Sequence, residues 1–357
     1  MEQFVCVRVV QAWGMDLSLF QFHGQLTWSV FFLNADRTIY GRYGSRAPSG
    51  TSGFKGNDRF VTLPGFRKAV EGALEIHKGY PGNKAALAGK TGPAPVARTP
   101  EAMPAAAGLS NVRQADGKSH GCVHCHQVQD WELLSLRAKG PVEDRVLWPW
   151  PMPDAVGLSL DPAERATVTE VAPGSAAAKA GLKPGDRIAA LGGQSILSIA
   201  DVQWVLQQAK EPCVVKGQVE RGAAKVEVSL ALAEGWRRAY SFADNLSLGW
   251  ITRQRLAGFR CDAVGPDEKQ KLGLGEKALA LRIREISPDF VKDRNTSPKK
   301  AGLQKGDLIV EVDGRKDAMT ESDYLAFLVQ KKKPGGKVDL AYVRGAAAPV
   351  KVTVDVP

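Results

Sequence analysis

One stretch of this chain is present twice, and the repetition constrains the fold more than any other feature. Residues 180–193 (AGLKPGDRIAALGG) match residues 301–314 (AGLQKGDLIVEVDG) over fourteen positions, at a constant offset of 121 residues. Each copy continues into a short helix pattern and then into two strand patterns separated by Arg-Gly. A repeat of this length is a whole domain, because the units of solenoid proteins are shorter. The sequence therefore predicts two related domains in its second half.

The repeated pattern resembles PDZ domains of the bacterial type. The first copy reads TVTEVAPGSAAAKAGLKPGDRIAALGG without a gap, which is the family's order of strand, Pro-Gly-Ser turn, short helix ending in Ala-Gly-Leu, Gly-Asp turn and strand. The second copy has about six extra residues before its Ala-Gly-Leu. The resemblance implies a β-barrel-like sandwich with two helices in residues 155–235 and again, after an N-terminal connector, in residues 236–357.

PDZ domains bind an extended peptide, usually a C-terminus, as an added strand beside a backbone nest for the carboxylate. In the first copy the resemblance places the nest at Val156, Gly157, Leu158, Ser159 and Leu160, with Ala200, Val202 and Leu206 on the helix side of the groove. In the second copy it places the nest at Gly258, Phe259 and Arg260. Because the walls are apolar, we expect an apolar terminal side chain. The helical spacing of Val202 and Leu206 fits simple core positions equally well.

Many bacterial PDZ domains accompany a protease, but this sequence contains neither Gly-x-Ser-x-Gly nor His-Glu-x-x-His. No protease, thioredoxin active-site or nucleotide-binding motif is present in the chain, so the sequence favours a binding protein over an enzyme.

Two of the five cysteines and three of the five histidines fall within seven positions, His120-Gly-Cys122-Val-His124-Cys125-His126. Cys-x-x-Cys-His is the attachment signature of c-type haem, in which the two thiols bind the porphyrin and the histidine binds the iron. We therefore expect haem on Cys122, Cys125 and His126. Met152 is the first choice for a sixth iron ligand, with His120, Met103 or an external group as alternatives.

Other chemistries fit the same cluster. Cys122, Cys125 and two of the histidines His120, His124 and His126 could hold zinc or copper. The two cysteines could also form a dithiol redox pair. The plainest alternative is a surface loop without chemistry.

The first part of the chain resembles an incomplete thioredoxin-like domain over residues 1–80. Residues 4–10 predict a strand, residues 26–33 and 38–43 a hairpin, and residues 63–76 a helix. The strand and helix that would carry the thioredoxin Cys-x-x-Cys are missing, so we credit this segment with no disulfide exchange. Residues 81–118 are rich in Ala, Pro and Gly and predict a linker, and residues 119–154 carry the Cys-x-x-Cys-His motif.

The composition is that of a folded chain. Its 357 residues are 44% hydrophobic and carry a formal net charge of +10. The longest apolar run, residues 28–33, is too short to span a membrane. No basic motif interleaved with aromatic residues accompanies the positive charge, so we expect no nucleic-acid partner. The fold class predicted is α+β and multidomain, with a partial thioredoxin-like α/β segment before two PDZ domains.

The location of the protein follows from conflicting signals. The start, MEQFVCVRVV, is a poor secretory signal because Glu2 and Arg8 interrupt it. A c-type haem, however, is attached outside the cytoplasm. We therefore expect a periplasmic or cell-envelope protein whose true start lies upstream of Met1.

These features together predict a non-catalytic envelope adaptor. Its two PDZ domains would bind peptide C-termini or strands, and its haem would serve electron transfer or redox sensing. The alternatives are a thiol-disulfide or zinc- or copper-binding redox protein that uses Cys122 and Cys125, and a regulatory partner of a separate protease.

Overall fold

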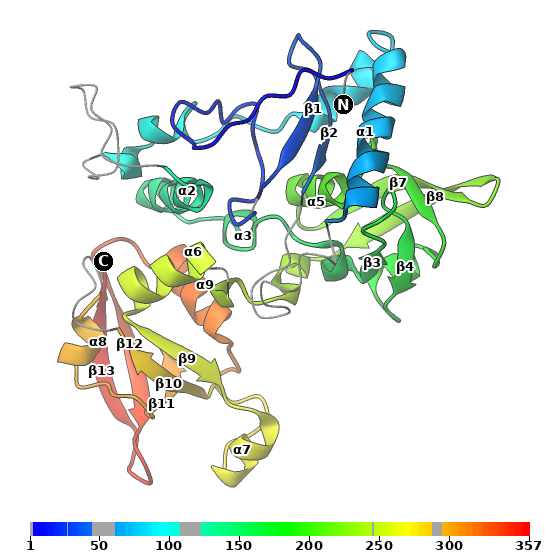
Figure 1. Cartoon of the computed structure of the whole chain (residues 1–357). Coiled ribbons are helices and arrows are strands. Elements are labelled where there is room, and N and C mark those ends of the chain that lie inside the picture. The colour runs from blue at the N-terminus through cyan, green and yellow to red at the C-terminus, as the bar shows by residue number, and fades with distance from the viewer. Residues whose placement is uncertain (1–2, 27, 45–60, 108–122, 245, 288–294) are drawn as a thin grey trace. The chain divides into compact units, whose positions relative to one another are not determined.

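The computed structural model describes residues 3–26, 28–44, 61–107, 123–244, 246–287 and 295–357 (Figure 1). The chain divides into two compact units. The first unit comprises Met1–Trp131 and Trp148–Tyr240, and the second comprises Glu132–Leu147 and Ser241–Pro357. No helix in the described ranges is long and apolar enough to cross a membrane.

The first unit begins with the predicted hairpin and helix. Strands β1 (Val30–Leu33) and β2 (Ile39–Tyr43) pair antiparallel. Helix α1 (Leu63–Lys78) begins after Thr62, whose hydroxyl accepts the backbone N–H of Gly65 at 3.1 Å. These elements confirm the expected hairpin and helix, while the thioredoxin-like relationship stays a prediction.

The strand expected at residues 4–10 is not formed. Over residues 3–10 the backbone is irregular, and the side chains of Val5, Val7 and Val10 are 94%, 83% and 74% exposed. A strand needs a neighbour that completes its hydrogen bonds, and no described strand pairs with this segment. The valines favour an extended backbone locally, but no neighbouring strand pairs with this segment in the described structure.

The expected linker also departs from the prediction. Within residues 81–118, three short 3₁₀ turns, η2 (Lys84–Lys90), η3 (Pro100–Ala102) and η4 (Pro104–Ala106), are formed. They bury Leu87, Lys90, Met103 and Ala106. The Ala-, Pro- and Gly-rich composition gave no indication that these residues are buried. The described part of the segment packs as part of the first unit. Residues 108–118 lie outside the described ranges.

The first unit continues into the first repeat copy. Turn η5 (Pro153–Val156) leads into two small antiparallel sheets, with strand orders β3-β4 and β6-β5-β7-β8. Its elements are β3 (Leu158–Leu160), β4 (Val168–Val171), α4 (Ala176–Lys179), β5 (Arg187–Leu191), β6 (Gln194–Ser195), α5 (Ile199–Gln208), β7 (Cys213–Arg221) and β8 (Ala224–Leu232), followed by η6 (Trp236–Ala239). A single buried apolar cluster fills the space between the sheets and α5.

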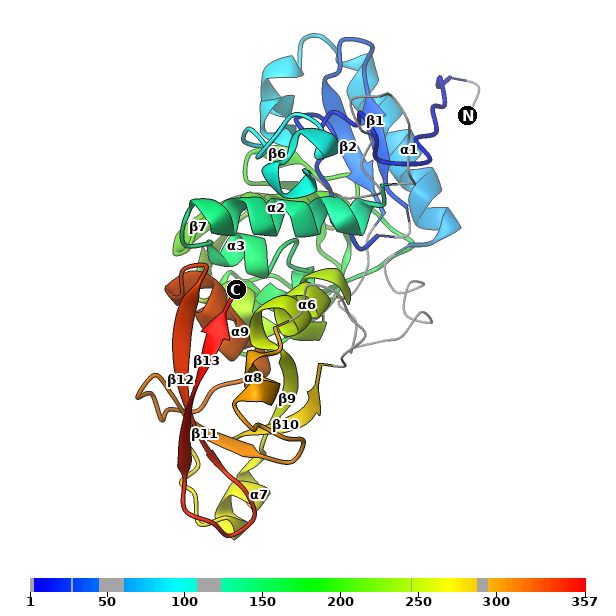
Figure 2. The same ribbon diagram turned by 90° about the vertical axis from the view of Figure 1, so that its left-hand side faces the viewer.

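The second unit contains the second copy. Its sheet has the order β13-β12-β11-β10-β9, all antiparallel. Its helical elements are α2 (Cys125–Lys139, which starts in the first unit), α3 (Asp144–Leu147), η7 (Phe242–Asp244), α6 (Leu246–Ile251), the π-helical turn η8 (Thr252–Ala257), α7 (Pro266–Lys271), α8 (Ser297–Lys300) and α9 (Glu321–Lys331). Its strands are β9 (Phe259–Ala263), β10 (Leu281–Ile286), β11 (Leu308–Val312), β12 (Gly336–Val343) and β13 (Val350–Val356). Helices α6 and α9 lie at one end of this sheet and α7 at the other (Figures 1 and 2).

A hydrogen-bonded turn explains why the repeated Gly-Asp is needed in the first copy. The buried carboxylate of Asp186 accepts two hydrogen bonds from the Arg221 guanidinium, at 2.7 and 2.8 Å, and one from the backbone N–H of Lys183 at 2.9 Å. Arg221 also donates to the carbonyl of Gly181 at 2.8 Å. The arginine of the Arg-Gly hairpin therefore fastens β7 to the turn that precedes β5.

The second copy repeats this arrangement bond for bond. Asp307 accepts from Arg344 at 2.7 and 2.8 Å and from the backbone N–H of Gln304 at 2.8 Å, and Arg344 donates to the carbonyl of Gly302 at 2.8 Å. The sequence repeat is therefore a repeat of the same physical fastening between a strand hairpin and a turn.

The acid stability of the first unit tests the fastening. The hydrogen bonds from Arg221 hold the pKa of Asp186 below its ordinary value of about 3.9. A lowered folded pKa contributes stability that is present above the ordinary value and lost as the pH falls through the folded value. We expect Asp186→Asn to lower the free energy of unfolding at pH 7 by about 1–3 kcal/mol and to remove part of the loss of stability below about pH 4, as measured by denaturant unfolding between pH 2.5 and 7.

The exposed Asp262 of β9 provides the control, because its pair with Arg284 is 3.7 Å long and both side chains are more than half exposed. Asp262→Asn should change stability by less than about 0.5 kcal/mol. Equal effects of the two substitutions would contradict the fastening.

Candidate functional site

The nest predicted in each copy is a glycine in a left-handed conformation. Gly157 has a φ of +84°, and a Cβ there would lie 2.2 Å from the Cβ of Ser175. Gly258 has a φ of +73°, and a Cβ there would lie 2.3 Å from the carbonyl oxygen of Asn295. Both the backbone angle and the space therefore require glycine. The two positions are equivalent, since the Gly157 carbonyl accepts from Ala172 and the Gly258 carbonyl accepts from Ser287.

The strand after Gly157 has one open edge. Strand β3 pairs with β4 and with no other described strand. Since the carbonyl of Gly157 and the N–H of Asp161 both bond toward β4, the alternation of an extended strand directs the N–H groups of Leu158 and Leu160 to the opposite edge. The side chains of these two leucines are buried and that of Ser159 is exposed. The edge therefore has backbone N–H groups that an added strand could bond.

The residues expected on the helix side of the groove are packed in the core. The side chains of Val202 and Leu206 are completely buried in the core cluster, together with Val156, Leu158 and Leu160. The core interpretation of these two residues, which the sequence left open, is the one that the structure favours. Every residue of α5 from Ile199 to Leu206 is buried, so this helix is covered on all sides.

One cover of α5 is the segment Trp148–Met152, which we call the Trp-Pro segment. The Gln203 side-chain amide donates to the carbonyl of Trp150 at 2.6 Å, and the N–H of Trp150 donates to the Gln207 side-chain oxygen at 2.6 Å. Gln203 also lies 3.2 Å from the Met152 sulfur. Sequence reasoning missed both glutamines. The available signal was their spacing of four residues on a mostly apolar helix, which places them on one face.

The other cover of α5 comes from the N-terminal part of the first unit. The Lys90 ammonium lies 2.9 Å from the Asp201 carboxylate, and both side chains are fully buried. Burial lowers the pKa of Lys90, and the adjacent carboxylate opposes that shift. Arg42 of β2 donates its backbone N–H to Asp201 at 3.2 Å and lays its guanidinium 3.8 Å from the ring centre of Trp204. The hairpin, η2 and the first repeat copy therefore form one body.

In the second unit, the edge strand β9 meets α9 directly. Phe259 stacks on Tyr324, with ring centres 5.4 Å apart. The Glu321 carboxylate accepts the backbone N–H of Cys261 at 3.0 Å and is itself paired with Arg253. Burial raises the pKa of the Cys261 thiol well above its ordinary value. Arg260 is partly exposed on the same strand. In this copy, the Glu321 side chain of α9 thus occupies the space between β9 and α9.

The Cys/His cluster lies at the start of α2. Cys125 and His126 stand in its first turn, and the ring of His126 stacks parallel to that of His124, with centres 5.5 Å apart. Burial, and secondarily His124, lowers the pKa of His126, which favours the neutral imidazole that metals bind. Burial raises the pKa of the Cys125 thiol, which disfavours the thiolate that disulfide exchange needs.

The other members of the cluster, His120 and Cys122, lie outside the described residues. Within the described ranges, no group of three or more His, Cys, Asp or Glu side chains is placed to hold a metal ion. The structure therefore stacks His124 on His126, but the described members His124, Cys125 and His126 do not form a metal-binding group by themselves, and the complete ligand set stays untested.

Met152, the first choice for a sixth iron ligand, lies inside the first repeat copy. Its side chain is 1% exposed and belongs to the core of the first repeat copy, where its sulfur contacts Gln203. The alternative ligand Met103 belongs instead to the cluster that contains Val123 and Trp131 on either side of Cys125. The assignment of Met152 as the sixth iron ligand stays a prediction; in this structure its side chain packs in the core of the repeat copy.

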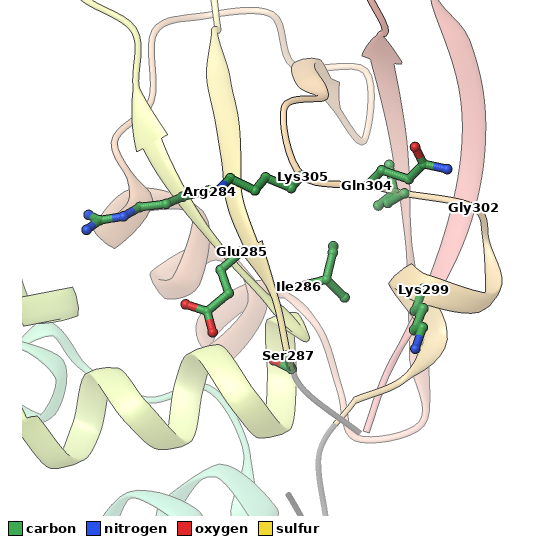
Figure 3. Close-up of a pocket in the computed structure, with 9 residues that line it drawn as sticks. Arg284, Glu285, Ile286, Ser287, Lys299, Gly302, Gln304 and Lys305 are labelled. Atoms are coloured by element: carbon green, nitrogen blue, oxygen red, sulfur yellow. The ribbon is translucent and has the colours of Figure 1, made fainter. Parts of the chain in front are cut away.

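The second unit also has an open depression of about 750 Å³ beside β10 (Figure 3). Ile286 points into it, while Lys299 and Lys305 lie at its sides. The remaining lining residues are Arg284, Glu285, Ser287, Gly302, Leu303 and Gln304. No sequence prediction fell on this surface.

The sequence profile of the PDZ domain family matches residues 167–216. This part of the chain is a PDZ domain. The match runs from the start of β4 into β7 and includes the Asp186 turn and α5, so the first repeat copy is hereafter called the first PDZ domain. No curated protein matches the chain.

Solved structures with similarity to the chain include an HtrA-type protease and a PDZ domain. A variant of the HtrA-type protease AlgW, solved with a decapeptide, is 18% identical over 40% of this chain and 40% of its own, with a TM-score of 0.24. The HtrA3 PDZ domain bound to a phage-derived ligand (FGRWV) is 23% identical over 27% of this chain and 86% of its own, with a TM-score of 0.19. This chain therefore spans less than half of the length of that AlgW structure.

The role of Leu206 can be tested by truncation. Because its side chain is fully buried in the core cluster, we expect Leu206→Ala to lower the free energy of unfolding by about 2–5 kcal/mol, as measured by urea unfolding of the full chain. Ser159→Ala, on the exposed face of β3, should cost less than about 0.5 kcal/mol. A similarly small effect of Leu206→Ala would mean that this residue lines an open groove.

Proposed function

We propose that the protein is a peptide-binding adaptor whose first PDZ domain takes up the C-terminal end of a partner chain as a strand beside β3. The observation that carries this proposal is the PDZ family match together with the open edge of β3 that follows Gly157. A C-terminal carboxylate would lie at the Gly157 turn, and the N–H groups of Leu158 and Leu160 would bond the peptide backbone. The apolar surroundings favour an apolar last residue.

We further propose that the second repeat copy is also a PDZ domain. The equivalent glycines Gly157 and Gly258 and the repeated fastening of Asp186 and Asp307 support this relationship. Gly258, Phe259 and Arg260 would then form its nest. Since Glu321 already holds the N–H of Cys261, the first PDZ domain is the better candidate for peptide uptake.

Peptide uptake can be tested with the full chain and a display library of random C-terminal peptides, followed by fluorescence anisotropy on selected sequences. We expect the selected peptides to end in apolar residues and to lose at least about tenfold in affinity when the C-terminal carboxylate is amidated, because the nest recognises the charged end. Equal binding of the free and amidated peptides would contradict carboxylate recognition. Failure to select any peptide would contradict the adaptor function.

We also propose that the cluster at the start of α2 is a c-type haem attachment site. Cys125, with Cys122 before it, would hold the porphyrin, and His126 would bind the iron, which would supply one-electron transfer. The lowered pKa of the His126 imidazole, whose side chain is exposed in the first turn of α2, supports an iron ligand. The raised pKa of the Cys125 thiol argues against a dithiol redox pair. Such a site would place the protein in the periplasm or cell envelope.

The haem proposal predicts covalent pigment in protein that is exported together with the haem-attachment machinery. A pyridine haemochrome spectrum should show the c-type α band, and Cys125→Ala should reduce it. The control His77→Ala removes a histidine on α1 and should leave the spectrum unchanged. A colourless protein that contains zinc or copper would instead support the metal alternative. A colourless, metal-free protein would contradict both the haem site and the metal site.

A separate protease as the partner of this adaptor is a second candidate. The chain carries a PDZ domain, a module that accompanies a protease in many bacterial proteins, and its sequence holds none of the protease motifs named above. Copurification of a protease with the tagged full chain would support this assignment.

A further inference from the structure

We infer that the Trp-Pro segment is an internal occupant of the groove of the first PDZ domain, and that an incoming peptide must displace it. This inference rests on the proposed peptide-binding function and adds its regulation and ligand preference. The groove is the space between β3 and α5, and the Trp-Pro segment precedes β3 directly through η5. Its backbone is held by hydrogen bonds to α5, the helix that bounds this space.

The attachment to α5 is specific. Gln203 and Gln207 stand one helical turn apart and bind both backbone groups of the same residue, since one donates to the Trp150 carbonyl and the other accepts the Trp150 N–H. The Trp150 ring also packs against Trp204, with ring centres 5.7 Å apart. Two side chains of α5 therefore form hydrogen bonds with the backbone of this segment.

Met152 provides the apolar part of the contact. It is 1% exposed and belongs to the same buried cluster as Val156 and Leu158 at the nest and Leu206 on α5. The cluster thus accepts an unbranched, flexible apolar side chain near the carboxylate turn. A displacing peptide is expected to present a side chain of the same chemistry, with methionine as the closest match.

The other end of the segment is anchored independently. The indole N–H of Trp148 donates to the carbonyl of Tyr240 at 2.9 Å, and the Arg238 guanidinium lies 4.9 Å from the Trp148 ring centre. The Tyr240 hydroxyl donates to the Pro149 carbonyl at 3.3 Å. Release of Trp150 and Met152 therefore leaves the segment tethered at Trp148, from which it can return.

The prolines make the internal occupant a weaker ligand than a peptide. Pro149 and Pro151 have no N–H group, and the N–H of Trp150 is used by Gln207. The segment is not part of a sheet with β3, whose open edge is unpaired by any described strand. A true peptide can gain the backbone hydrogen bonds along β3 that the segment does not make. These additional hydrogen bonds allow a peptide to displace the Trp-Pro segment, although the tethered segment has a high effective concentration.

The second PDZ-like copy shows the same principle with different chemistry. The residues before its Gly258 supply Arg253, which holds Glu321 of α9 against the open-edge N–H of Cys261. In both copies, the run of chain before the nest glycine thus contacts the helix that lines the groove.

A matched pair of substitutions tests the occupant. Gln203→Glu removes the donor to the Trp150 carbonyl and places a carboxylate against it, whereas Gln207→Glu keeps the acceptor for the Trp150 N–H. Both add one negative charge to the same helix face. Loss of a hydrogen bond that favours the closed state raises the open fraction and lowers the apparent Kd in proportion.

The probe is a fluorescein-labelled Gly/Ser decapeptide that ends in Val-Leu-Met with a free carboxylate, and the control probe ends in Val-Leu-Asp. We expect the full chain with Gln203→Glu to bind the Met probe roughly tenfold more tightly than the chain with Gln207→Glu, as one lost hydrogen bond predicts. Hydrogen exchange at the Trp150 amide should be faster in Gln203→Glu, and in the wild type it should become faster on saturation with the Met probe.

The outcomes separate this inference from the proposed function. If the wild type and both variants bind the Met probe equally and the Trp150 amide stays protected in the complex, the internal occupant is refuted while peptide binding stands. If no variant binds the Met probe and the display library also yields no peptide, the peptide-binding function fails and the displacement mechanism fails with it. Preference for the Asp probe would overturn the predicted ligand chemistry.

Discussion

The buried carboxylate of Asp201 is the constraint on which the first unit depends. A charge removed from water must be compensated by an opposite charge and by hydrogen bonds. Here the compensation comes from the Lys90 ammonium, the backbone N–H of Arg42 and the backbone N–H of Leu197. Two of these three partners belong to the segment before the PDZ domain. The packing of β2 and η2 on α5 therefore supplies most of the compensation for the buried Asp201 carboxylate.

This packing determines how much of α5 is accessible to a peptide in the groove. In an isolated PDZ domain, one face of the groove helix is available to ligand. In this chain, the N-terminal part covers α5 from one side and the Trp-Pro segment covers it from another, so that residues 199–206 are all buried. The strand side remains open at β3. A binding module in this state keeps its backbone donors ready but has its side-chain pocket filled, and ligand uptake becomes a competition inside one molecule.

The sequence predicted the parts of this arrangement that are local. The repeat and the short helix after each copy, expected at 199–209 and 321–330, could be predicted directly because helices with apolar periodicity carry local signals, whereas the two nest glycines were placed by the resemblance to PDZ domains. The hairpin of β1 and β2 was predicted in the same way from its two strand patterns at 26–33 and 38–43. The predicted strand at 4–10 was not formed, because its pairing depends on a neighbour that local propensity cannot supply.

The contacts that define the candidate site were not local and could not be read. The roles of Gln203 and Gln207 depend on a segment more than fifty residues away in sequence, and Lys90 reaches Asp201 across more than a hundred. The packing of Met152 in the core cluster of the first repeat copy likewise had no signal in the local sequence. Composition predicted a linker over residues 81–118, but the described part of this Ala-, Pro- and Gly-rich stretch forms packed turns.

The most direct test of the account is a backbone amide NMR titration of the full chain, with selective ¹⁵N-leucine labelling, against a peptide with an apolar C-terminus. The account predicts that the amides of Leu158 and Leu160, at the open edge of β3, show the largest leucine shifts and become protected from exchange in the complex. Leucine shifts confined to Leu303, beside the depression at β10, with Leu158 and Leu160 unchanged, would contradict it.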